Sequence, residues 1–355
     1  MVMPHQKLQK LLLSALAAFS SLATASHLDS IDRKVPTHDA NGKTSHKVEH
    51  RLAPEIYSQS PFASQSRVVA YKAPNPGSTA AASNRIVYQG GAIMNGVSKI
   101  VVIWYGNWNQ SNNADTPAGQ QIIRDAIYGF SVHNSNYNYA GITTGYASNL
   151  GTFTQSDSTY VTQMSSPVIQ EFTQATSSIY GGKTLTDASV FSLVKAFAGS
   201  GDSNAIYLVL SSSDIAESSG FLTRYCGWHT YGPTDSNTIK YAFIGNPNKS
   251  LSACGVQTIS PNGNAAVDAM ISVIAHELVE TVTDPLIDAW YNSLGSENSD
   301  MCAWSFGSRT NRSSSGAYWN VSLPTASGQT RNYLLQRQLG VKDSKCYINA
   351  SGPVQ

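Results

Sequence analysis

Charged residues are scarce in this sequence, and their scarcity excludes several classes of partner. Only 13% of the 355 residues are Asp, Glu, Lys or Arg, and the formal net charge is +1. Such a chain has no basic field that would attract nucleic acid or an anionic membrane surface. We therefore expect no nucleic-acid partner. The low charge, together with plentiful Ser, Asn, Gly and Tyr, is typical of an extracellular protein.

Long apolar runs are also missing, except for one short run near the amino terminus. Residues 11–22 are mostly apolar, follow a lysine-containing start and precede an A-x-A cleavage pattern at residues 23–25. The run is too short to span a bilayer. We interpret residues 1–25 as a secretory signal peptide and expect a secreted protein with no membrane span.

Regular periodicity is absent from residues 26–84, which are polar and hold four of the eight histidines. We interpret this segment as a flexible leader or pro-segment, one that could pack against the domain. It should be more sensitive to proteases than the domain that follows. Because their spacing is irregular, the four histidines are expected in a solvated tail rather than at a metal: His27, His38, His46 and His50.

Cysteine is limited to four residues: Cys226, Cys254, Cys302 and Cys346. An even number in a secreted chain predicts two disulfides, for which three pairings exist. No C-x-x-C pattern occurs, so a cysteine zinc site is not expected.

Five N-x-S/T sequons permit glycosylation of a secreted chain. A sequon only permits the modification, but five of them predict that some carry glycans. They lie at Asn109, Asn248, Asn311, Asn320 and Asn349.

The rest of the chain predicts one mixed α/β domain over residues 85–355. Continuous β-branched and aromatic runs indicate strands buried on both faces of a sheet; they lie at residues 99–106, 205–211 and 239–245. Helical spacing of apolar residues predicts helices at residues 117–130, 166–180, 188–198 and 264–284. We expect buried strands flanked by helices, with two disulfides and with a zincin-like arrangement as one form of this fold.

The last of these helices carries the residues of greatest chemical interest. Asn264 is the predicted N-cap and Pro285 the predicted stop. An apolar stripe at spacings of three and four defines one face, and His276 and Glu280 lie roughly opposite it, one turn apart. An imidazole and a carboxylate buried on such a helix need partners.

The pattern His276-Glu277-x-x-Glu280 predicts a site for one zinc ion or another divalent ion. In the H-E-x-x-H pattern, two ligands one turn apart hold zinc and the intervening Glu activates water. A carboxylate is an acceptable second ligand, so Glu280 fits, and Glu277 would be the catalytic base if the protein is an enzyme. Glu297 or Asp300 would complete the ligand set.

Other interpretations of these polar residues stay open. His276 and Glu280 could form a buried polar pair that orients the following loop. His229 is a more distant metal ligand or a histidine hydrogen-bonded beside a disulfide. A serine of residues 211–213 with Asp214 and His229 could form a triad, because Asp214 follows a buried strand. No G-x-S-x-G, P-loop or G-x-G-x-x-G pattern occurs.

Several motifs follow one another in a characteristic order. They are Tyr88-Gln-Gly-Gly, Ile103-Trp-Tyr-Gly, the runs 207–214, 226–231 and 240–245, and Val267 to Glu280. In this order they resemble the plant Exordium / phosphate-induced protein 1 family, and the resemblance covers about residues 85–346. Members typically carry E-I-G-D-x-C where this chain has Glu297-Asn-Ser-Asp300-Met-Cys302.

The cysteine pattern departs from the plant members in one respect. They usually carry two further cysteines, where this chain has Leu222 and, approximately, Gln257. Both are missing together, as expected if they bond to each other, which indicates a more distant member of the family. We predict that Cys226 pairs with Cys254, joining loops after successive core strands. Cys302 would then pair with Cys346 and hold the carboxy-terminal segment beside the proposed site.

The resemblance implies a secreted glycoprotein of the cell wall or apoplast that acts with an extracellular partner in growth and cell-expansion signalling. The family implies no established reaction. The alternative is a zinc-dependent hydrolase of peptidase type using the His276 helix. A second alternative is a carbohydrate-binding wall protein, suggested by 18 Tyr and 6 Trp residues.

Overall fold

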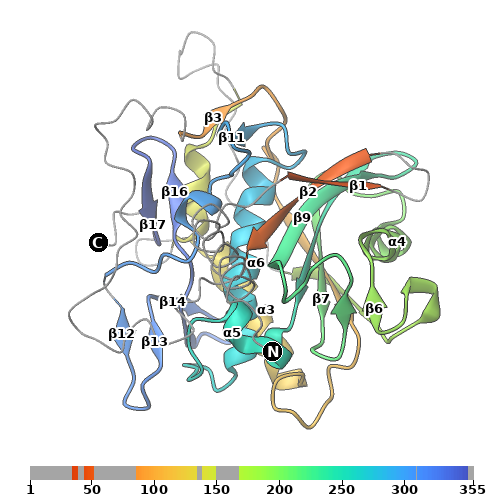
Figure 1. The fold of residues 1–355 in the computed structure, drawn as a ribbon. Helices are drawn as coiled ribbons and strands as arrows, with labels where there is room; N and C mark the ends of the chain where they lie inside the picture. Colours follow the sequence, from red (N-terminus) through yellow and green to blue (C-terminus); the bar gives the residue numbers. More distant parts are fainter. Residues whose placement is uncertain are drawn as a thin grey trace, which may run out of the picture. The chain divides into compact units, whose positions relative to one another are not determined.

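A seven-stranded mixed sheet organises the part of the chain that is described (Figure 1). The computed structural model describes residues 34–38, 44–51, 85–133, 138–148, 168–308 and 310–350. In spatial order the strands are β1 (Lys34–His38), β2 (Thr44–Arg51), β9 (Tyr225–Pro233), β10 (Thr238–Gly245), β7 (Ala205–Ser211), β4 (Lys99–Tyr105) and β5 (Val168–Gln174). The last four strands of this order, from β10 to β5, run parallel to one another. The pairs β1–β2, β2–β9 and β9–β10 are antiparallel.

Helices cover both faces of this sheet, so the fold is the predicted mixed α/β domain with buried strands (Figure 1). Alternate side chains of β4 enter separate cores: Ile100 packs with the residues of α3 and α6, and Val101 packs with those of α4. This alternation follows from the two-residue period of a strand. The helices are α3 (Pro117–Ser131), α4 (Asp187–Ala198), the short α5 (Leu251–Cys254) and α6 (Ala265–Thr283).

The helix starts follow from their sequences. Thr116 accepts a hydrogen bond from the Gly119 N–H and precedes Pro117, the residue that suits a first helical position. At α4, Thr186 and Ser189 form a reciprocal capping box. Both helices were predicted from the spacing of their apolar residues, and both predictions are confirmed.

Short two-stranded pairs and 3-10 turns complete the domain. They bring residues 290–340 against α6 and the helical turn near Ala140. The paired strands are β3 (Val87–Tyr88) with β11 (Trp290–Tyr291), β6 (Thr184–Leu185) with β8 (Ala216–Glu217), β12 (Asn311–Arg312) with β13 (Tyr318–Trp319), β14 (Val321–Pro324) with β15 (Thr330–Tyr333), and β16 (Gln338–Gly340) with β17 (Lys345–Tyr347). The 3-10 turns are η2 (Ala140–Gly145), η3 (Ser178–Tyr180), η4 (Pro247–Ser250) and η5 (Asp300–Cys302).

Two disulfides link these peripheral parts to the core. Cys226 of β9 is bonded to Cys254 of α5, and Cys302 of η5 is bonded to Cys346 of β17. The Cα atoms lie 5.5 and 5.7 Å apart, an ordinary spacing for a disulfide. Both disulfides join the pairs of cysteines that the sequence analysis predicts.

Three features of the structure differ from the sequence predictions. Residues 168–174 form strand β5 instead of the predicted helix, because they pair in parallel with β4, a contact that local spacing cannot reveal. Strand β9 was not predicted, because its polar and glycine residues lack the apolar run of a buried strand, although it pairs with a neighbour on each side. Residues 34–38 and 44–51, expected to be aperiodic, are strands of the central sheet.

The predicted signal peptide, residues 1–25, and His27 lie outside the described residues. Of the helices in the described ranges, none combines the length and the hydrophobicity that crossing a bilayer requires.

Candidate metal centre

Helix α6 is buried along almost its entire length and carries the polar residues of the site. Asn264 caps it by accepting a hydrogen bond from the Val267 N–H, and residues 266–283 are all buried. Opposite it on β9, Gly227 has no side chain: a Cβ atom there would lie 2.7 Å from Val273 Cγ1. Glycine at this position therefore allows the helix to lie close against the sheet.

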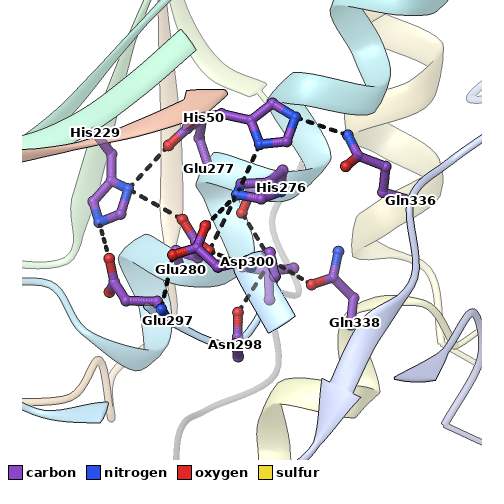
Figure 2. Close-up of polar contacts among 12 residues, drawn as sticks. His50, His229, His276, Glu277, Glu280, Glu297, Asn298, Asp300, Gln336 and Gln338 are labelled. Atoms are coloured by element: carbon purple, nitrogen blue, oxygen red, sulfur yellow. Dashed lines mark hydrogen bonds and ion pairs between the residues drawn. The ribbon is translucent and has the colours of Figure 1, made fainter. Parts of the chain in front are cut away.

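One group of ligand-type atoms surrounds the His276 imidazole. Its Nε2 lies 3.1 Å from Glu280 Oε1 and 3.3 Å from Asp300 Oδ1 (Figure 2). The three residues offer ligand atoms that all lie within 4.8 Å of one another. His276 and Glu280 come together because they are one helical turn apart. Asp300 reaches them from η5, as the sequence analysis proposed for one of its two acidic candidates.

The backbone of the following loop orients this carboxylate. The Glu297 N–H donates to Asp300 Oδ2 at 2.9 Å, which leaves Oδ1 directed at His276. The Asp300 N–H in turn donates to Glu280 Oε1 at 3.0 Å. Such outer contacts fix the orientation of ligand carboxylates in metal sites. The Cys302–Cys346 disulfide holds the same turn.

A second group gathers around His229 of β9. Its Nδ1 lies 3.0 Å from Glu277 Oε2 and 3.7 Å from Glu280 Oε2, and its Nε2 lies 3.5 Å from Glu297 Oε2 (Figure 2). Glu297, the other acidic candidate, thus belongs to the His229 side of the cluster. Glu280 contributes one oxygen to each group.

His50 of β2 completes the cluster, and the sequence analysis did not identify it. Its Nδ1 lies 3.1 Å from His276 Nε2, and its Nε2 lies 3.0 Å from the side-chain amide nitrogen of Gln336. The ring stacks on Trp304 at a centroid distance of 5.0 Å. No local pattern marks this residue, because only the long-range pairing of β2 with β9 brings it to α6.

Hydrogen bonds connect the cluster to the carboxy-terminal strands. Ser299 donates to Gln338 Oε1 at 2.5 Å, and the amide nitrogen of Gln338 donates to the hydroxyl of Tyr139. Burial raises the pKa of Tyr139 well above its ordinary value, so its phenol stays neutral. Asn298 donates to Thr283 at the end of α6.

The cluster gathers four acidic side chains in the interior. The side chains of Glu277, Glu280, Glu297 and Asp300 have at most 2% exposure. The imidazoles of His229 and His276 lie within ion-pairing distance of them and are charged only when protonated. Ionised carboxylates that are buried close together repel one another, and a bound cation would offset this repulsion.

Divalent zinc would fit the His276 group. A tetrahedral ion with bonds of about 2.0 Å separates its ligand atoms by about 3.3 Å. The distances from His276 Nε2, at 3.1 and 3.3 Å, match that separation. The predicted serine triad does not form this site: Asp214 accepts from Ser212 and pairs with Lys183, while His229 contacts the carboxylates of α6.

Comparison with known proteins gives the family of the chain. The conserved region of phosphate-induced protein 1 matches residues 86–349. The chain belongs to this family. The resemblance in the motifs is therefore confirmed, and the matched region contains every residue of the cluster except His50.

Curated relatives of this phosphate-induced protein 1 family member are Arabidopsis thaliana proteins. Identity is 28% to Protein EXORDIUM-like 3, over 71% of this chain and 79% of that relative. It is 27% to Protein EXORDIUM-like 5, over 66% of each chain, and 26% to Protein EXORDIUM, over 60% of this chain and 70% of the relative. No solved structure matches the chain.

Proposed function

We propose that this Exordium-family chain is a secreted protein whose activity depends on one zinc ion held by His276, Glu280 and Asp300. The observation that carries the proposal is the convergence of these three buried side chains, with Glu280 and Asp300 oxygens 3.1 and 3.3 Å from the same imidazole nitrogen. A divalent cation would offset the repulsion between the two carboxylates. The same ion would be coordinated by the neutral imidazole nitrogen of His276.

The donor set favours zinc over the other common divalent ions. Zinc accepts imidazole nitrogen and carboxylate oxygen in a four-coordinate arrangement. Calcium takes six to eight oxygen ligands, and magnesium keeps several waters. The His276 group offers one nitrogen and two carboxylates inside a closed interior, which supplies too few oxygens for either of the hard ions.

We also propose an extracellular role, in the cell wall or apoplast, in growth and cell-expansion signalling. The two disulfides support an oxidising compartment. The relatives named EXORDIUM and EXORDIUM-like support the family context of this role. An extracellular partner would bind the protein and pass on the signal.

Peptide hydrolysis is the second candidate function, and the position of Glu277 favours it. This residue follows the ligand His276, and His229 holds its carboxylate at 3.0 Å, beside Glu280. When bound, zinc would polarise a substrate carbonyl and supply an activated water. Glu277 would accept the proton of the attacking water, and His229 would keep the carboxylate in position.

The metal proposal is tested by metal analysis of the purified secreted protein. We expect one zinc per chain, lost in His276→Ala. His133→Ala is the matched control, because His133 is exposed and contacts only a backbone oxygen in the described structure. A wild-type chain without stoichiometric metal, and with thermal unfolding indifferent to a chelator, contradicts the proposal.

Glu277→Gln separates the two candidate functions. We expect the variant to keep its zinc, because Glu277 is not a ligand, and to lose hydrolysis of an unstructured peptide mixture. If zinc and growth-promoting activity both survive the substitution, the metal is structural and the hydrolase is excluded.

A further inference from the structure

The amino-terminal segment is attached to the domain through specific contacts on both faces of β2. The strand pairs antiparallel with β9, placing Lys47 opposite Thr230 and His50 opposite Gly227. The Lys47 ammonium lies 2.9 Å from Asp187 Oδ1 and over the rings of Tyr225 and Trp228, with 1% side-chain exposure. His50 is also fully buried, on the side of α6.

His50 places a further ligand-type atom beside His276 Nε2 of the proposed zinc site. Its Nδ1 lies 3.1 Å from His276 Nε2, the same distance that separates this nitrogen from Glu280 Oε1. Both values agree with the ligand separation of about 3.3 Å in a tetrahedral zinc site. Two imidazoles and two carboxylates around zinc also give zero net charge, which suits a buried centre.

We propose that His50 is the fourth zinc ligand and that the amino-terminal strand keeps the centre latent. This inference rests on the proposed function of the His276 group. A site with four protein ligands is closed, as in structural zinc sites, whereas catalytic sites keep one position open. With His50 bound, no position remains for water or substrate. Withdrawal of β2 leaves three protein ligands and an open position.

The surroundings of His50 suit a ligand that is held but removable. Coordination through Nδ1 leaves the ring proton on Nε2, which faces the Gln336 amide. A half-turn of this amide presents its oxygen to that proton, at the cost of the bond from the Trp304 N–H. One neutral hydrogen bond contributes far less to stability than the binding of zinc by an imidazole does. The ligand therefore stays in place while its strand stays paired.

Withdrawal of the strand also defines the class of substrate. β2 occupies the edge of β9 through main-chain hydrogen bonds, so its departure leaves an unpaired edge beside the zinc ligands. An extended peptide can pair with such an edge. The latent strand thus occupies the place of an extended polypeptide substrate running antiparallel to β9. A cavity along α6, lined by Ala269, Ser272 and Trp304 among others, lies next to the ring that covers His50.

Cobalt substitution of the full-length protein tests the inference. The variants are His50→Ala and His50→Phe; the phenyl ring of the second keeps the stack on Trp304 but cannot bind a metal. His133→Ala is the control. The readouts are metal content, the visible absorption of bound cobalt, and its response to acetohydroxamate, a small metal-binding probe.

We expect one ion per chain in every protein. The cobalt spectrum of the wild type and of the control should not respond to acetohydroxamate. Both His50 variants should have shifted spectra and should respond saturably, and they should cleave an unstructured peptide several-fold faster than the wild type, in which β2 leaves the site only transiently.

Three outcomes overturn the inference, and they are distinguishable. If the His50 variants keep the wild-type spectrum and ignore the probe, His50 is not a ligand and the three-residue centre stands. If both variants lose the ion, His50 is a permanent structural ligand. If the wild type itself binds no ion, the proposed function fails first.

Discussion

Glu280 directs its two carboxylate oxygens at different imidazoles. Oε1 lies 3.1 Å from His276 and Oε2 lies 3.7 Å from His229. One side chain therefore couples the proposed ligand set to the pair formed by His229 and Glu277. A shift of this carboxylate would therefore alter its contacts with both imidazoles at once.

Asp268, two turns before His276 on α6, allows a pH test that does not involve the metal ligands. It accepts hydrogen bonds from Ser260 and Asn262, but burial raises its pKa to about 6. Its pKa in the unfolded chain is near 3.8. Between these two pKa values the folded state keeps a proton that the unfolded state releases. The contribution of Asp268 to the free energy of unfolding is therefore fully present below pH 4 and is lost as the pH rises through 6.

We predict that the wild type loses stability relative to Asp268→Asn by about 2 kcal/mol between pH 4 and pH 7. Urea unfolding of both proteins across this range measures the difference. Contributions from the metal cluster cancel, because both proteins contain it. A difference that is independent of pH would show that Asp268 titrates normally.

At the residue scale, the sequence predicted the proposed ligands that lie close together in the chain. His276 and Glu280 follow from helical spacing, and the short return of the chain after Pro285 offered Glu297 and Asp300 equally, of which the structure places Asp300 beside His276. The pairing of Glu297 with His229 was not predicted, because it depends on the position of β9. The sequence analysis placed His50 in a solvated tail. Its burial depends on the pairing of β2 with β9, which lies far along the chain and leaves no local pattern.

At the scale of elements, β2 is held by two different kinds of contact. Main-chain hydrogen bonds join it to β9, and Lys47 anchors its other face on Asp187 and Ser219. β2 lies between β1 and β9, and only its pairing with β9 joins it to the core of the sheet. The anchor lies on the opposite face from the zinc ligands, so the two can be altered separately.

Replacing Lys47 by Ala should release the strand without altering a ligand. The buried ammonium pairs with Asp187, whose side chain is 23% exposed, so its loss should weaken docking by about 2 kcal/mol, somewhat less than for a fully buried pair. We expect faster proteolysis within residues 34–51 and a cobalt spectrum that responds to acetohydroxamate. Limited proteolysis and the probe titration measure the two effects.

Lys99→Ala is the control for this prediction. Lys99 pairs with Asp202, but both side chains are more than one-third exposed, so the pair contributes little. Protection of residues 34–51 in Lys47→Ala equal to that in Lys99→Ala would show that Lys47 does not hold the strand.

The elements that the sequence predicted correctly are those with strong local patterns. The apolar runs of β4, β7 and β10 and the helical spacing of α3, α4 and α6 determine their own structure. In β5, Val168 and Phe172 are four residues apart and so suggest a helix. This segment forms a strand instead, because pairing with β4 supplies main-chain hydrogen bonds along its length.

At the scale of the whole molecule, the five sequons differ in their surroundings. Asn109, Asn248 and Asn311 are exposed. Asn320 is half-buried, and its amide nitrogen donates to the backbone oxygens of Phe306 and Leu335. A glycan on that nitrogen would replace one of these donors, so glycosylation and folding compete at this position.

We predict glycans on the three exposed asparagines and none on Asn320 in the folded, secreted protein. Glycopeptide mass spectrometry measures the occupancy. Asn320→Gln should leave the total glycan mass unchanged but lower the melting temperature, because the longer side chain cannot reproduce the bonds to the backbone. A fully occupied Asn320 in a stable protein contradicts this account.

The distance along the chain between β2 and its partners has a consequence for the order of assembly. His50 and His276 are separated by 226 residues, whereas Glu280 and Asp300 are separated by 20. The amino terminus is made first, yet its strand must wait for β9 to be synthesised. In the proposed centre, His276, Glu280 and Asp300 would therefore bind their ion before the strand closes over it. An ion enclosed in this way would escape only as fast as the strand undocks, so its identity would be set by the compartment in which the chain folds and not by the medium into which it is released.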